Sequence, residues 1–92
     1  MLSKTPIDLS KVKQENIDKE ILRLGIIAEY DAVSLYEQMA EMTNDEEIRA
    51  ILLDIADEEK EHIGEFQTLL LARDKELGEK MEEGKREVEE LT

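Results

Sequence analysis

The sequence QENIDKEILRLGIIAEYDAVSLYEQMAEM, residues 14–42, decides the fold of this chain. At about 100° per residue its apolar side chains gather on one side of a helix. The central stripe consists of Ile17, Ile21, Leu24, Ala28, Ala32, Leu35, Met39 and Met42. The flanking apolar positions are Leu22, Ile26, Val33, Tyr36 and Ala40. Together they cover roughly 200° of arc, about twice the stripe of an ordinary surface helix. We therefore expect this helix to pack against two partners, one within the chain and one outside it.

A second amphipathic helix is predicted over residues 45–73, after a short break. The break matches the spacing of a capping box in two registers. These registers are Thr43 with Glu46 and Asn44 with Glu47. The apolar stripe of the second helix consists of Ile48, Ile51, Leu52, Ile55, Ala56, Ile63, Phe66, Leu69 and Leu70. Two long amphipathic helices with a short connection form an antiparallel hairpin.

One glycine interrupts the apolar side of the first helix. Gly25 lacks a side chain, which permits a second helix to approach closely at this point. The alternative is that Gly25 is a tolerated weak point, costing the helix about 1 kcal/mol. Both interpretations remain open from the sequence.

The two ends of the chain differ from its middle. Residues 1–13 hold the only proline and show no clear periodicity, so we expect an extended N-terminal segment. Residues 74–92 are acidic, and apolar residues recur there at helical spacing, interrupted by two glycines, which predicts a short helix or linker. The remaining residues, 14–73, form the predicted hairpin. Two helices bury too little apolar surface alone, so we expect an all-α chain that dimerises into a four-helix bundle.

The net charge and the absence of cysteine limit the kinds of partner and site that this chain can have. Twenty-five Asp and Glu residues against 12 Lys and Arg residues leave a net charge of −13. Such acidity disfavours nucleic acid and anionic membranes as partners. It is compatible with attracting cations, or with solubility alone. The chain has no cysteine, so disulfides and thiolate sites are excluded. The absence of a long apolar run and of a signal-like N-terminus predicts a cytoplasmic protein.

Three polar residues lie where the apolar arcs should be continuous. Glu59 and His62 are three residues apart on the second helix, so both project from one face. Glu29 lies inside the wide arc of the first helix. Buried carboxylates are costly unless they are paired or bind a metal. Carboxylate oxygens with a neutral imidazole suit iron or manganese.

These three residues are half of a known ligand pattern. Ferritin-like di-iron bundles use one Glu from each of two helices and Glu-x-x-His from each of the other two. Two copies of this chain would supply the full set, namely two each of Glu29, Glu59 and His62. The alternative is structural, because Glu-x-x-His arises easily in a Glu-rich helix and a single helical His is often a core residue.

Further polar residues near this group have weaker claims. Tyr36 lies two turns after Glu29 on the same side of the helix. It could serve the metal site as a hydrogen-bond donor or electron source, or pack its ring at a subunit interface. Asp31 points toward the polar side, either as a cation entry site or as a solvated charge. Glu58 and Glu61 are predicted to be solvated.

Three segments resemble the encapsulated ferritins, the cargo proteins of encapsulin nanocompartments. They are AEYDAVSLY at residues 28–36, IL at 51–52 and DEEKEH at 57–62. The similarity covers about residues 18–75 and is closest to archaeal forms fused to the shell protein.

This resemblance implies a ferroxidase that acts inside an encapsulin shell. It implies a homodimer with two iron ions, and dimers assembled into a ring, typically a decamer. It places the family's metal ligands on Glu29, Glu59 and His62, its nearby tyrosine on Tyr36 and an acid of its iron-entry site on Asp31. A second entry-site acid of some members is Ala28 here. Calcium or zinc can replace iron at such carboxylate-rich sites.

Three hypotheses follow for the function. The first is the ferroxidase, with Glu29, Glu59, His62 and Tyr36 as its catalytic residues. The second is a rubrerythrin-like scavenger of peroxide or oxygen, which normally has a complete four-helix chain and a cysteine module. The third is a non-catalytic helical assembly module in which hydrogen bonds satisfy Glu59 and His62.

Overall fold

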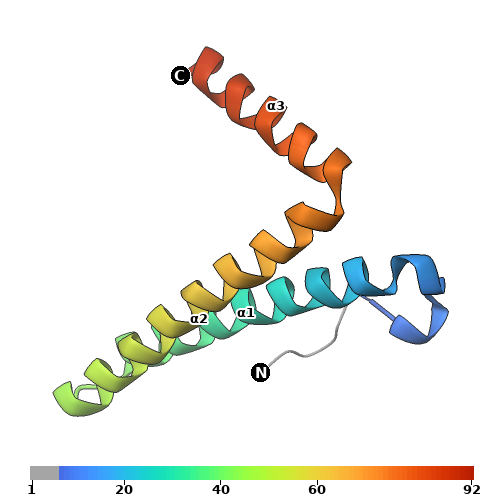
Figure 1. Ribbon diagram of the computed structural model, residues 1–92. Coiled ribbons are helices and arrows are strands. Elements are labelled where there is room, and N and C mark those ends of the chain that lie inside the picture. Colours follow the sequence, from blue (N-terminus) through green and yellow to red (C-terminus); the bar gives the residue numbers. More distant parts are fainter. Residues whose placement is uncertain (1–6) are drawn as a thin grey trace.

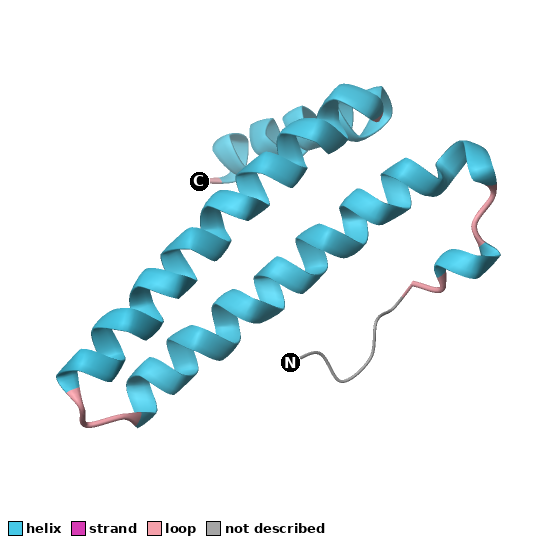
Figure 2. Cartoon of the chain, turned by 60° about the horizontal axis from the view of Figure 1, so that its bottom comes forward, coloured by secondary structure: helices cyan, strands magenta, loops and turns pink. Residues whose placement is uncertain are grey.

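The computed structural model describes residues 7–92, and within that range every regular element is helical, as predicted (Figure 1). Three α-helices form the chain, α1 (Ile17–Met42), α2 (Glu46–Arg73) and α3 (Lys75–Leu91). Two single turns of 3₁₀ helix precede them, η1 (Leu9–Lys11) and η2 (Gln14–Asn16). Helices α1 and α2 run antiparallel side by side, whereas α3 leaves the end of α2 at an angle (Figures 1 and 2). The predicted hairpin is confirmed.

The turn between α1 and α2 is held by its own polar residues. Asp45, rather than either predicted capping residue, is the N-cap of α2, and its carboxylate accepts from the backbone N–H groups of Glu47 (2.9 Å) and Ile48 (3.1 Å). Asp is among the best N-cap residues, and its charge also suits the helix dipole. Thr43 instead ends α1, and its hydroxyl accepts from the N–H of Asp45 at 3.1 Å.

Arg49 fastens the two helices together beside this turn. Its Nε donates to the carbonyl oxygen of Ala40 at 3.1 Å, and Nη2 donates to the carbonyl oxygen of Thr43. Its Nη1 pairs with the carboxylate of Glu46. The last carbonyls of a helix have no partner within the helix, so this guanidinium satisfies the C-terminus of α1 from the next helix.

The buried core of the hairpin is small. The buried apolar side chains of the described residues are Leu22, Ala32, Ala40, Ala56 and Leu70. Alanines on both helices allow close approach, but they bury little area each. Large apolar residues remain exposed, among them Ile48 (51% exposed) and Ile51 (62% exposed) on α2. Because burying such side chains is worth about 1.5–3 kcal/mol each, this exposed surface favours a further partner.

A partly buried ion pair lies at the start of α3. Asp74 is only 8% exposed and is the N-cap of α3, accepting from the N–H of Leu77 at 3.1 Å. The same carboxylate accepts from Nη2 of Arg23 on α1 at 3.0 Å. The hydrogen bond from Leu77 is the main cause that lowers the pKa of Asp74 below its usual value, and the bond from Arg23 adds to it. Burial acts in the opposite direction. Asp74 therefore links the first turn of α3 to helix α1 of the hairpin.

The end segments differ in part from their predicted forms. Helix α3 is continuous over 17 residues through Gly78 and Gly84, since a capped helix tolerates a glycine at about 1 kcal/mol each. The N-terminal segment, expected to be extended, contains η1, where the Asp8 carboxylate accepts from the N–H of Ser10 at 3.0 Å. Residues 1–6 of that segment lie outside the described range. None of the helices in residues 7–92 has the length and apolar character to cross a membrane.

Candidate metal centre

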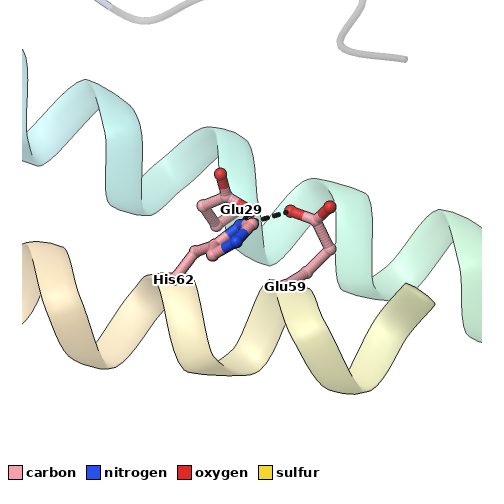
Figure 3. A group of neighbouring side chains, drawn as sticks. All are labelled: Glu29, Glu59 and His62. Atoms are coloured by element: carbon pink, nitrogen blue, oxygen red, sulfur yellow. Dashed lines mark ion pairs between the residues drawn. The ribbon is translucent and has the colours of Figure 1, made fainter. Parts of the chain in front are cut away.

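Glu29, Glu59 and His62 meet between α1 and α2, near the middle of the hairpin (Figure 3). One ligand atom from each residue lies within 4.8 Å of the others, and no second group of this kind occurs in residues 7–92. Glu59 and His62 come from successive positions on one face of α2, and Glu29 faces them from α1. The three residues that interrupted the apolar arcs are therefore neighbours in space.

The distances within this group are too long for ordinary hydrogen bonds. Nδ1 of His62 lies 3.4 Å from Oε2 of Glu29 and 3.5 Å from Oε2 of Glu59. N–H···O bonds in proteins are about 2.7–3.2 Å between heavy atoms. The oxygen Oε2 of Glu29 is buried and has no hydrogen-bond partner. A buried carboxylate oxygen without a partner costs free energy unless another cation or donor occupies the site.

No nearby basic side chain compensates the two carboxylates. Within the described part of the chain, no Lys or Arg forms an ion pair with Glu29 or Glu59. Lys60, the residue after Glu59, turns away and pairs with Glu37 of α1 at 3.0 Å. That carboxylate, by its hydrogen bond and its charge, raises the pKa of Lys60. The two carboxylates of the candidate site therefore have no lysine or arginine partner in this part of the chain.

The donor set fits a divalent metal ion of intermediate hardness. Two carboxylates and one imidazole match the ligands of non-haem iron and of manganese, and they can also accept zinc. The unpartnered oxygen of Glu29 is the observation that tests this fit, because coordination would satisfy it. Three protein donors leave coordination positions open, and the His62 side chain is still 45% exposed. In one chain the site is therefore open on one side.

Two other predicted site residues do not join this group. Tyr36 and Asp31 are both half-buried on α1, and neither contributes a ligand atom to the cluster of three. Their predicted roles remain predictions. The structure adds the partners in two contacts that the sequence does not specify, the Arg23–Asp74 pair and the contact of Phe66 with Gly25. Both join residues far apart in the chain, so only the hairpin register reveals them.

Comparison with known proteins agrees with this fold. The family model described as Rubrerythrin matches residues 20–92. The crystal structure of the encapsulated ferritin domain from Pyrococcus furiosus is 50% identical in sequence and superimposes with a TM-score of 0.84. That comparison covers 100% of this chain and 94% of the solved chain. The chain therefore belongs to the rubrerythrin family and, within it, to the encapsulated ferritins.

Two curated relatives extend this comparison. A ferritin-like-encapsulin shell fusion protein of Pyrococcus furiosus is 51% identical over 100% of this chain and 27% of its own length. The encapsulin nanocompartment cargo protein EncC of Myxococcus xanthus is 39% identical over 73% of this chain and 54% of its own length. The chain thus spans about a quarter of one relative and about half of the other.

Proposed function

We propose that this chain is a ferroxidase whose di-iron site is shared between two copies of the chain. The observation that supports this most strongly is the buried, unpartnered Oε2 of Glu29 beside Glu59 and His62. One chain offers three protein donors, and two chains related by a two-fold axis would offer six, the number used by ferritin-like di-iron sites. The metal implied is iron, with two ions per dimer.

The surface around the open side of the site suits a second copy. On α2, Glu59 and His62 share their face with the exposed Ile48, Ile51 and Leu69. On α1, Ile21 is similarly exposed on the side of Gly25 and Ala28. A two-fold axis through this face would cover the same apolar residues of both chains. It would also complete the ligand set, so burial and metal binding favour the same dimer.

The residues of the site would have separate tasks. Bound iron would supply the redox chemistry: two Fe²⁺ ions would lose one electron each, and with two protons these electrons would convert dioxygen to hydrogen peroxide, or hydrogen peroxide to two water molecules. Glu29 and Glu59 would bind the ions and balance their charge. His62 would hold one iron through a ring nitrogen. Tyr36, seven residues after Glu29 on α1, would donate a hydrogen bond or an electron. Asp31 would attract incoming Fe²⁺ at the surface.

We infer the setting of this activity from the relatives. Their names associate them with encapsulin shells, as a fusion in one case and as cargo in the other. We propose that dimers of this chain form a ring of ten chains, as the resemblance to encapsulated ferritins implies, inside an encapsulin nanocompartment in the cytoplasm. An open ring of hairpins encloses no mineral, so iron storage would depend on the shell.

Anaerobic titration of the metal-free protein with Fe²⁺, followed by light scattering and then exposure to air or peroxide, tests the proposal. We expect one iron per chain, bound by dimers or larger species and oxidised faster than in buffer. Glu59→Gln should abolish binding, whereas Glu58→Gln, at the neighbouring exposed carboxylate, should not. Failure of the wild type to bind iron would leave a helical assembly module. Turnover with peroxide but not with oxygen would instead favour the rubrerythrin-like scavenger.

A further inference from the structure

The ring of Phe66 on α2 rests directly on the backbone of α1 at Gly25. A Cβ atom at position 25 would lie 3.2 Å from Cε2 of Phe66, 3.3 Å from Cδ2 and 3.4 Å from Cζ. Carbon atoms in favourable contact are about 3.5–4.0 Å apart. The ring can therefore occupy this place because residue 25 has no side chain, and any larger residue would push the ring or the helix away.

This contact lies one helical turn from the candidate metal centre on both helices. Gly25 precedes Glu29 by four residues on α1, and Phe66 follows His62 by four residues on α2. Residues four apart on a helix are neighbours on one face. Because the two helices are antiparallel, the Gly25–Phe66 contact and the Glu29–His62 approach of 3.4 Å are successive cross-helix contacts.

The other glycines of the chain lack such a neighbour. A Cβ atom at Gly64 or Gly84 would meet nothing within 4 Å, and at Gly78 it would meet only Leu71 at an ordinary 3.9 Å. The close approach at Gly25 is therefore specific to the turn beside the metal ligands. It is not a general feature of glycines in these helices.

We propose that Phe66 seated on Gly25 is the spacer that sets the separation of α1 and α2 at the metal centre. The inference rests on the proposed function of Glu29, Glu59 and His62 and adds two positioning residues that do not bind the metal. Metal–ligand distances are defined to about 0.2 Å. A shift of a few tenths of an ångström at position 25, transmitted over one turn, is therefore enough to move Glu29 away from its place relative to His62.

A titration with Co²⁺, whose visible absorption depends on its ligand geometry, tests this proposal. We expect Gly25→Ala to weaken Co²⁺ binding roughly tenfold, the low end of the effects of changes just outside a metal's ligands, and to alter the visible spectrum. The Tm of the metal-free variant should not fall in proportion, because alanine favours the helix. Gly64→Ala is the matched control, since it adds the same methyl group to open space two residues from His62.

A second substitution separates crowding from other causes. Phe66→Leu in the Gly25→Ala background moves volume across the contact while nearly conserving its total, the kind of exchange that packed sites tolerate best. We expect the double variant to recover most of the wild-type affinity and spectrum. Coupling between the two substitutions in such a cycle is the signature of direct contact.

The outcomes distinguish this inference from the proposed function. If the wild-type protein binds no Co²⁺ or Fe²⁺, the proposed function fails and the spacer fails with it. If the wild type and Gly64→Ala bind metal and Gly25→Ala binds it equally well, the spacer alone is overturned. A loss of binding in Gly25→Ala that Phe66→Leu does not restore also overturns it, because the ring would then not be the cause.

Discussion

Nδ1 of His62 on α2 lies 3.4 Å from Oε2 of Glu29 on α1, and this carboxylate oxygen is buried without a hydrogen-bond partner. Glu59 approaches the same nitrogen at 3.5 Å. Two carboxylates around one imidazole, with no lysine or arginine paired to them in residues 7–92, favour a metal ion over a structural hydrogen-bond network.

Replacing Glu29 should separate metal binding from stability. We expect Glu29→Met to abolish Fe²⁺ binding and to leave the metal-free protein as stable as before, or more stable by up to about 1 kcal/mol, because a buried oxygen without a partner is removed. Glu61→Met, at an exposed carboxylate of α2, is the control. Anaerobic titration and thermal unfolding measure the two effects. A clear loss of stability in Glu29→Met would instead assign this residue a structural role.

The exposed apolar residues beside the site should control dimer formation. We expect Ile51→Glu, on the side of α2 that carries His62, to shift the protein toward monomers and to weaken metal binding at least tenfold, because it would bury a charge in the proposed interface. Leu53→Glu is the matched control, since Leu53 is 47% exposed on the other side of α2. Analytical ultracentrifugation with and without Fe²⁺ measures the fraction of monomers for each variant. Equal effects of both variants would argue against an interface on the His62 side.

The cap of α3 should be sensitive to acid. The pKa of Asp74 is lowered in the folded chain, mainly by the N–H of Leu77 and also by Arg23 and Lys19. A lowered pKa means that ionised Asp74 contributes stability at neutral pH, and that this contribution is lost as the pH falls through the folded pKa. We expect Asp74→Asn to lower Tm at neutral pH, and this difference from the wild type to shrink as the pH falls below the ordinary Asp value of about 3.9 toward the lower folded pKa.

Thermal unfolding of Asp74→Asn across this pH range is compared with Asp54→Asn, a substitution at an exposed aspartate of α2. The control should show no such dependence. An Asp74→Asn variant whose Tm differs from the wild type by the same amount at every pH would mean that the charge of Asp74 is unimportant.

The stability of the hairpin turn should depend on the two hydrogen bonds that the planar guanidinium of Arg49 donates, and not only on its charge. Arg49 donates to the carbonyls of both Ala40 and Thr43, which a lysine cannot do in the same geometry. We expect Arg49→Lys to cost about 1–2 kcal/mol in the free energy of unfolding. Arg73→Lys, which affects one hydrogen bond to Leu69, should cost less. Denaturant unfolding measures the free energy of unfolding of both variants. Equal losses would show that the paired hydrogen bonds of the Arg49 guanidinium are not important.

Much of this molecule follows from the period of its apolar residues. The stripes from Ile17 to Met42 and from Ile48 to Leu70 were enough to predict two long helices, their hairpin and an apolar surplus, because a helical period is a local property. The polar interruptions at Glu29, Glu59 and His62 were likewise readable, since each lies at a fixed angle on its own helix.

Tertiary structure decided what depends on the relative placement of the helices. The Arg23–Asp74 pair at the start of α3 and the contact of Phe66 with Gly25 join residues distant in the sequence and follow from the relative placement of the helices. The register of α1 against α2 brings Glu29 within 3.4 Å of His62. A helical period places each side chain on a face but not opposite a particular partner, because register is set by packing between residues distant in sequence.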